Sequence, residues 1–151
     1  MKAVIQRVSA ASVSVDNEVI SKINSGLLVL LGVAVDDEDF DADILSQKIS
    51  KLRIFSDENG KMNKSGIDTD GSILVISNFT LYANTQKGNR PDFINAAPPD
   101  KALRLYELFI DKLKANGVKE VYGGKFGGDM KVSLCNDGPV TIIMDTIIWR
   151  R

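Results

Sequence analysis

The first part of the chain has the hydrophobic pattern of β-strands. From residue 2 to residue 35, apolar side chains alternate with polar ones or run together, and β-branched residues are enriched. Asp16-Asn17 and Asn24-Ser25-Gly26 provide turn residues between the apolar segments. We therefore predict an antiparallel meander whose last strand is buried on both faces. Its segments are residues 3–5, 12–15, 19–20 and 27–31.

Helical periodicity follows the acidic cluster at residues 36–39. Apolar positions recur along one side of a helix, and the carboxylates lie at its N-terminal end, where they complement the helix dipole. The cluster is therefore interpreted as helix-capping and not as a metal site. The residues on the predicted side are Phe40, Ile44, Leu45, Lys48, Ile49 and Leu52.

The middle of the chain alternates between sheet and helix signals. Residues 53–55 are predicted to resume the sheet, and residues 72–77 predict a second buried strand. Residues 83–99 form the longest polar connection, and loops of that length are commonly functional. Pro98-Pro99-Asp100 opens a second helix that Asn116-Gly117 closes. Its apolar stripe is Leu103, Tyr106, Ile110 and Leu113.

Two further strands are predicted at residues 118–122 and 130–134. The Gly-rich link 123–128 between them lacks the spacing of a phosphate-binding loop and is interpreted as a hairpin connection. The apolar segment 147–149 is prone to exposure and indicates docking on the domain or on a partner subunit.

Residues 136–141, Asn-Asp-Gly-Pro-Val-Thr, are turn-forming and lie between two apolar strand segments. At Gly138-Pro139 there is no glycine Cβ to hold a ligand away, and proline lacks an N–H donor while both carbonyl acceptors remain. On these residues alone, a simple β-turn is the favoured interpretation. The alternative is a turn that presents bare carbonyl oxygens to a ligand.

Composition limits the function classes. With 151 residues, 44% hydrophobic and 26% charged, the chain fits one soluble domain spanning residues 1–151. The longest apolar run, residues 26–35, is shorter than the roughly 20 residues that span a bilayer. The alternating N-terminus does not resemble a signal peptide. We expect a cytoplasmic protein with no membrane association.

The chain has no histidine and one cysteine, Cys135. This excludes catalytic triads and dyads that use histidine, imidazole zinc sites and an intrachain disulfide. Cys135 is predicted to be buried and inert, and no metal or cofactor is expected. The net charge of −1 argues against broad electrostatic binding of nucleic acid. Small basic patches remain as candidates at residues 87–90 and at Arg150-Arg151.

Hydroxyl groups follow the second buried strand at Ser77 and Thr80. Either could face a cleft at the end of that strand and act as a nucleophile. Without histidine, however, activation would require a nearby lysine or carboxylate.

Several motifs, taken together, resemble the D-aminoacyl-tRNA deacylase family (D-tyrosyl-tRNA deacylases). The two most specific are Ser77-Asn78-Phe79-Thr80-Leu81 and the segment 136–141, and the resemblance runs nearly end to end. The other matching segments are residues 3–8, 26–33, 52–55, 60–63, 87–91 and 129–134.

The resemblance implies a small β-barrel-like α/β (α+β) fold and a homodimer. It also implies hydrolysis of the ester that joins a D-amino acid, or glycine mischarged on tRNA(Ala), to the terminal adenosine of tRNA. In the family a cis Gly-Pro element reaches across the dimer and excludes L-amino acids, a role that falls on Gly138 and Pro139. Asn78, Phe79 and Met130 would bind substrate.

The catalytic mechanism has two readings. An aminoacyl ester is already activated, so the ribose hydroxyl could assist water while backbone N–H groups near Phe79 and Thr80 stabilise the oxyanion. Alternatively, Thr80 or Ser77 acts as a nucleophile.

The chain departs from the family where Asn78 replaces the usual glutamine and Gly128 a common alanine. Because asparagine is one methylene shorter, a hydrogen bond from that side chain is lost, lengthened or bridged by water. A different class of function also stays open, namely a non-catalytic module that binds RNA ends or belongs to a larger synthetase.

Overall fold

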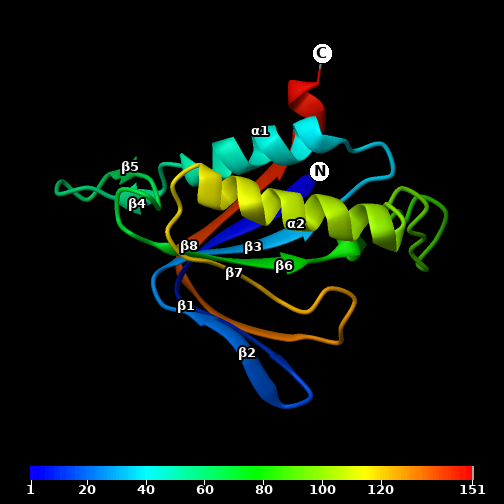
Figure 1. The fold of residues 1–151 in the computed structure, drawn as a ribbon, viewed down its shortest axis with the longest axis horizontal. Coiled ribbons are helices and arrows are strands. Elements are labelled where there is room, and N and C mark those ends of the chain that lie inside the picture. Colours follow the sequence, from blue (N-terminus) through cyan, green and yellow to red (C-terminus); the bar gives the residue numbers. More distant parts are fainter. Residues whose placement is uncertain (151) are drawn as a thin grey trace.

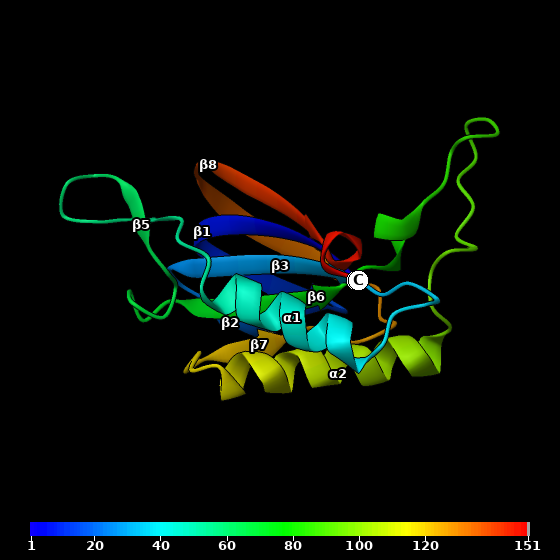
Figure 2. The same cartoon turned by 90° about the horizontal axis from the view of Figure 1, so that it is seen from above.

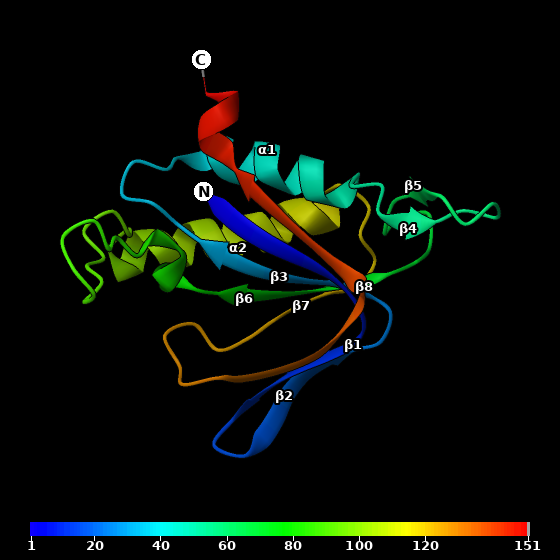
Figure 3. The same ribbon diagram turned by 180° about the vertical axis from the view of Figure 1, so that it is seen from behind.

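The structure is a computed structural model that describes residues 1–150. Strands β1 (Lys2–Val15) and β8 (Lys131–Asp145) pair antiparallel along most of their length (Figure 3). The other edge of β1 is shared, because its first half pairs with β3 (Gly26–Gly32) and its second half with β2 (Glu18–Ile23). The four predicted segments all lie in strands, but residues 3–5 and 12–15 belong to the single strand β1. The meander is wrong, since β2 and β3 pair with β1 and not with each other.

Two parallel pairs complete a barrel-like sheet. β6 (Ser72–Ser77) is parallel to β3, and β7 (Val121–Gly123) is parallel to β6. Ser21 Oγ on β2 donates to the Gly123 carbonyl on β7 at 2.7 Å and so links the two ends of the sheet. Parallel pairs need crossover connections, and α1 (Asp39–Ser50) and α2 (Pro99–Ala115) provide them on one side of the sheet (Figures 1 and 2). The predicted mixed, barrel-like fold with two main helices is confirmed.

Alternation along β3 divides the hydrophobic core in two. Leu27, Val29 and Leu31 face the helices, whereas Leu28 faces the barrel interior. β6 follows the same rule, with Val75 toward the helices and the residues on either side of it inward. Each fully buried leucine stabilises the fold by roughly 1.5–3 kcal/mol. The prediction that these strands are buried on both faces is confirmed.

Both predicted helices are present. Glu38 and Asp41 form a capping box at the start of α1, which confirms the capping role of the acidic cluster. The buried face of α1 contains Leu45 and Ile49 as predicted, but Phe40 is 53% exposed. α2 ends at Asn116, and Gly117 follows with φ of +104°. Its buried residues are Leu105, Tyr106, Phe109 and Leu113, so Leu103 was wrongly included.

Two predicted connections are wrong. Residues 53–55 do not rejoin the main sheet, because β4 (Phe55–Ser56) pairs with β5 (Met62–Lys64) in a separate two-stranded sheet. Residues 123–128 do not join a hairpin, because β7 pairs with β6 while β8 pairs with β1.

The segment 136–141 is not a chain-reversing turn. It lies within β8, where Asn136 pairs with Val8 and Thr141 with Gln6, so four residues bulge out opposite Arg7. Cys135 is exposed on the same strand, contrary to the prediction that it is buried. Among residues 1–150, no helix is both long and apolar enough to cross a bilayer.

A buried charge cluster ties the two ends of the described chain together. The Met1 ammonium donates to Asp37 at 2.6 Å and to Thr146 at 2.5 Å, and Thr146 donates to Asp41. Arg150, after the 3₁₀ helix η2 (Thr146–Trp149), donates to Asp41 at 3.0 Å and also contacts Asp37. Burial favours a higher pKa for Asp41, but hydrogen bonds from Arg150 and Thr146 outweigh it and lower the pKa. Arg150 is therefore not free for phosphate, and Arg151 lies outside the described residues.

The C-terminal apolar segment, residues 147–149, is only partly packed against the domain. Trp149 packs against the core, and Lys48 Nζ lies 5.5 Å from its ring centroid. Ile147 and Ile148 stay exposed. Docking on the domain is thus confirmed for Trp149 alone.

We expect Asp41→Ala to lower the free energy of unfolding by about 3 kcal/mol, because it removes one carboxylate of the buried cluster and leaves Arg150 Nε and the Thr146 hydroxyl without their acceptor. Asp43→Ala on the same helix is the matched control. Its carboxylate pairs with Lys112 at 3.0 Å on a half-exposed surface, so a loss below about 1 kcal/mol is expected. Urea denaturation at neutral pH measures both. Equal losses would show that burial of the cluster does not strengthen it.

Candidate active-site cavity

A cavity of about 1010 Å³ opens at one end of the barrel. Its floor is the inward face of β3 and β6, and its walls come from the segments that follow β6, precede α2 and lead into β8. Most of the lining is apolar and aromatic, with few polar groups, which is typical of a site for a small organic group. The lining includes Gln6, Leu28, Leu30, Ile76, Ser77, Asn78, Phe79, Thr80, Phe93, Tyr106, Phe126, Asp129 and Met130.

The segment 77–81 forms one wall. Ser77 ends β6, the Asn78 amide donates to the Leu31 carbonyl at 2.8 Å, and the 3₁₀ helix η1 (Phe79–Tyr82) begins directly afterwards. Within residues 1–150 the Phe79 and Thr80 amides donate to no acceptor. Such free N–H groups at a helix start can stabilise negative charge on an oxygen.

The Thr80 hydroxyl is already engaged. Its Oγ1 donates to Asn78 Oδ1 at 2.5 Å, and an amide oxygen is not a base that removes a proton. Among the described lining residues there is no lysine, and the one carboxylate is Asp129, whose side chain is 92% exposed and paired with Lys131 at 3.8 Å. The geometry thus offers no activating base beside Thr80 or Ser77.

Aromatic pairs form the rim and the far wall. Phe79 meets Phe93 edge-on at 5.0 Å, and Phe79 is 58% exposed. An exposed ring of this kind can stack on a nucleobase. The ring centroids of Tyr106 and Phe126 lie 5.9 Å apart. The Tyr106 hydroxyl donates a hydrogen bond to the Val75 carbonyl at 2.9 Å. Burial raises the pKa of Tyr106, so the phenol stays protonated near neutral pH.

Gly138 and Pro139 lie outside this cavity. Both are exposed, and the peptide bond between them is cis. Asn136 Oδ1 accepts from the Val140 amide at 2.8 Å, and Arg7 Nε donates to the Asp137 carbonyl at 3.0 Å. These two side chains hold the bulge from both ends.

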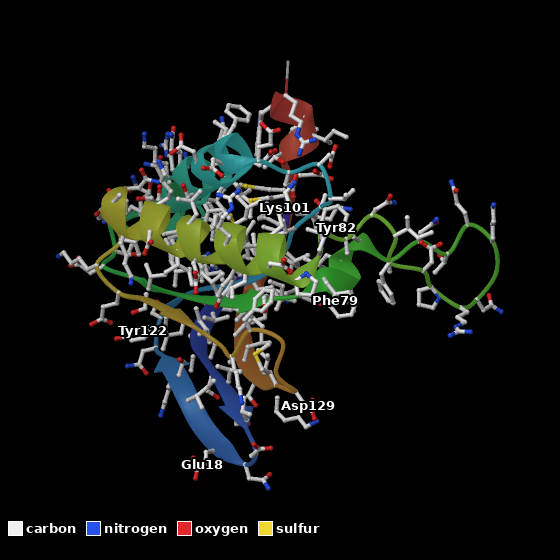
Figure 4. All side chains as sticks on the ribbon, turned by 45° about the vertical axis from the view of Figure 1, so that its right-hand side comes forward. Glu18, Phe79, Tyr82, Lys101, Tyr122 and Asp129 are labelled. Atoms are coloured by element: carbon white, nitrogen blue, oxygen red, sulfur yellow. The ribbon has the colours of Figure 1, made fainter. Side chains whose placement is uncertain are left out.

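The structure therefore brings together Ser77, Asn78, Phe79, Thr80 and Met130 from the predicted site, but not the Gly-Pro element. Sequence reasoning did not name as site residues Gln6, Phe93, Tyr106, Phe126 and Asp129, which also line the cavity. The position of Phe93 in the long polar connection was the one available signal. In Figure 4, Phe79 lies at the foot of that connection, on the side of the molecule that also carries Asp129.

The barrel, its two covering helices and the apolar cavity define an α+β protein with a candidate binding site at one end of the barrel. The family model described as D-Tyr-tRNA(Tyr) deacylase matches residues 4–145, and the chain belongs to this family. A protein of Roseiflexus sp. (strain RS-1) named D-aminoacyl-tRNA deacylase is 51% identical over 99% of this chain and 96% of its own length. A protein of the same name from Bacteroides fragilis is 54% identical over 97% of each chain.

A solved structure gives the same result for the fold. The c-Myc DNA Unwinding Element Binding Protein superposes with a TM-score of 0.91 at 44% identity, covering 96% of this chain and 98% of that one.

The back wall of the cavity depends on a close contact between Gly123 and Tyr106. A Cβ at Gly123 would lie 2.5 Å from Tyr106 Oη. We expect Gly123→Ala to lower the free energy of unfolding by about 1–3 kcal/mol through overpacking. Tyr106→Phe alone should cost about 1 kcal/mol, the value of one hydrogen bond.

In the double variant the next atoms lie 3.4 Å or more from the new Cβ, so the two losses should be less than additive. Urea denaturation of all four proteins measures this coupling. Strict additivity would show that contact with the Tyr106 hydroxyl is not the reason why a side chain at residue 123 is destabilising.

Proposed function

We propose that this chain hydrolyses the ester bond of D-aminoacyl-tRNA, releasing a free D-amino acid and tRNA. The observation that carries the proposal is the wall formed by residues 77–81, where two residues of an apolar cavity with an aromatic rim have backbone amides without an acceptor in the described chain. The terminal adenosine would stack at Phe79, and the aminoacyl group would lie deeper in the cavity, near Met130. Family membership and the names of the relatives support the same activity.

The chemistry is assigned to the backbone and the substrate. Water attacks the ester carbonyl, and the Phe79 and Thr80 amides stabilise the oxyanion that forms. The carbon–oxygen bond to the ribose then breaks, and the ribose oxygen leaves as a hydroxyl that takes up the proton lost by water. The neighbouring ribose hydroxyl can relay that proton, which explains how a chain without histidine hydrolyses an ester.

Selectivity is assigned to Gly138 and Pro139 acting across a homodimer. Both are exposed and absent from the cavity of their own chain. β8 also carries the exposed Ile143, and its edge away from β1 has no strand partner among the described residues, so a second copy can cover it. The carbonyls of the element would then meet an L side chain but not a D side chain. Glycine has no side chain to exclude, so glycyl-tRNA mischarged on tRNA(Ala) is a second substrate.

No described feature favours a module that binds RNA ends without turnover, and multiple turnovers on D-tyrosyl-tRNA would exclude it. The cytoplasm, where aminoacyl-tRNA is made and used, is the proposed location.

We expect the purified protein to deacylate D-tyrosyl-tRNA at least about a hundredfold faster than L-tyrosyl-tRNA, since only the L side chain meets the carbonyls of the Gly-Pro element. Release of radiolabelled tyrosine under multiple-turnover conditions measures both rates. Light scattering on the same sample should give the mass of a dimer. Equal rates would contradict the selectivity proposal, and a monomer at assay concentration would contradict its route across the interface.

We expect Thr80→Ala to retain more than about a tenth of the wild-type kcat, because its hydroxyl is bonded to Asn78 and no base stands beside it. Ser77→Ala is the matched test of the other hydroxyl. Single-turnover deacylation of D-tyrosyl-tRNA separates chemistry from product release. A loss of about a thousandfold or more in either folded variant would instead assign that residue as the nucleophile.

A further inference from the structure

The connection between η1 and α2, residues 83–98, forms an arm that extends away from the body of the protein (Figure 2). Its base is a single antiparallel bridge, in which the amides and carbonyls of Asn84 and Asp92 exchange hydrogen bonds at 2.9 and 3.0 Å. Beyond the bridge every residue from 85 to 91 is exposed. Gly88 has φ of +114°, and a Cβ on this residue would have no atom within 4 Å, so the tip turns in open solvent.

Residues at both ends of the arm line the cavity. Phe79 stands just before the arm and Phe93 on its returning side, and the two rings contact each other at the cavity rim. The chain spans at most about 3.6 Å per residue, so the Cα atom of Arg90 lies within about 11 Å of the Cα atom of Phe93, and that of Lys87 within about 22 Å. The tip is therefore within reach of a ligand segment that extends out of the cavity past Phe79 and Phe93.

The charges of the arm and the cavity differ. Among its described lining residues the cavity has no lysine or arginine. Lys87 and Arg90 at the tip make no ion pair or side-chain hydrogen bond within residues 1–150, whereas Lys101 near the base is bonded to the Val35 carbonyl at 2.7 Å. The carboxylate of Asp92, the acidic residue of the arm, accepts from the Ile94 amide.

We propose that Lys87 and Arg90 bind phosphates of the tRNA strand that leads out of the cavity. The inference rests on the proposed function, which places the terminal adenosine at Phe79. Each preceding nucleotide carries one negative charge, and the lining residues that the structure describes include no cation to neutralise it. Lys87 and Arg90 are the cations of the connection that runs from Phe79 to Phe93, so the arm would bind the RNA without touching the ester.

The double variant Lys87→Ala/Arg90→Ala tests this assignment. We expect kcat/KM for D-tyrosyl-tRNA to fall about tenfold at about 0.15 M salt, and the slope of its logarithm against log salt to decrease by about 2. With D-tyrosyl-adenosine, which has no phosphate, kcat/KM should stay at the wild-type value. The single variant Arg90→Lys should keep most of the contribution of Arg90 to the salt-dependent part of binding, because counterion release depends on the charge that neutralises the phosphate.

Lys51→Ala/Lys61→Ala is the control, since it removes the same charge. Both residues are exposed without ion pairs in the described chain, after α1 and before β5, at the end of the molecule opposite the arm (Figure 1). Wild-type behaviour of the arm variant on D-tyrosyl-tRNA would overturn the proposal. An equal loss on both substrates would also overturn it, because the arm would then act by shaping the cavity. A change in mass by light scattering would assign the arm to a protein interface instead.

Filter binding of uncharged tRNA to the same variants keeps this test separate from catalysis. If the wild type fails to turn over D-tyrosyl-tRNA, the proposed function fails, and the arm is judged by binding alone. A weaker affinity in the arm variant but not in the control supports phosphate contact, and equal affinities reject it.

Discussion

Backbone hydrogen bonding along both edges of β1 fixes the positions of three other strands. β8 occupies one edge, and β3 and β2 divide the other. The resulting strand order is β2-β1-β3-β6-β7. Because Ser21 on β2 bonds to Gly123 on β7, the two ends of this order come together and the sheet curls into a barrel. The same strand sets the bulge of β8, because Arg7 stands opposite the four extra residues and bonds to one of them. The cavity and the Gly-Pro element therefore share one scaffold, although Gly138 and Pro139 do not line the cavity of their own chain.

The two-sided burial of β3 and β6 has a chemical consequence. The outward faces of these strands are used for packing against α1 and α2, and the inward faces line the cavity with leucine and isoleucine. Few ionisable groups can then reach the reacting ester. What remains is the backbone where β6 ends, at the start of η1. Loss of one such amide donor typically costs about 2.7–4 kcal/mol of transition-state stabilisation, so correct backbone placement can replace an acid–base side chain when the ester is already activated.

The sequence predicted the elements better than their partners. The unbroken apolar run 27–31 indicated burial on both faces, and the stripe of Tyr106, Ile110 and Leu113, though not Leu103, indicated the inner side of α2. Both signals are local, because burial depends on local side-chain direction. Pairing depends on contacts between distant segments, which is why the hairpin at residues 123–128 and the reversal at 136–141 were wrong. For the candidate site, motif resemblance named Ser77 to Thr80 and Met130, and these residues line the cavity. It did not name Phe93, Tyr106 or Phe126, which the fold brings to the same cavity.

Among the described lining residues the cavity has no cation, whereas the arm carries Lys87 and Arg90. The free-energy cost of removing a charge from water explains this difference. A lysine placed inside an apolar cavity would lose hydration without gaining a partner until RNA arrives. At an exposed arm the same charge keeps its hydration in the free protein and exchanges it for a phosphate on binding. Lys87 and Arg90 fit this arrangement because the bridge between Asn84 and Asp92 fixes only the base of the arm, so the tip stays in water. Affinity for the RNA and selectivity for the amino acid can then be set by different residues, one group at the tip of the arm and the other in the bulge of β8.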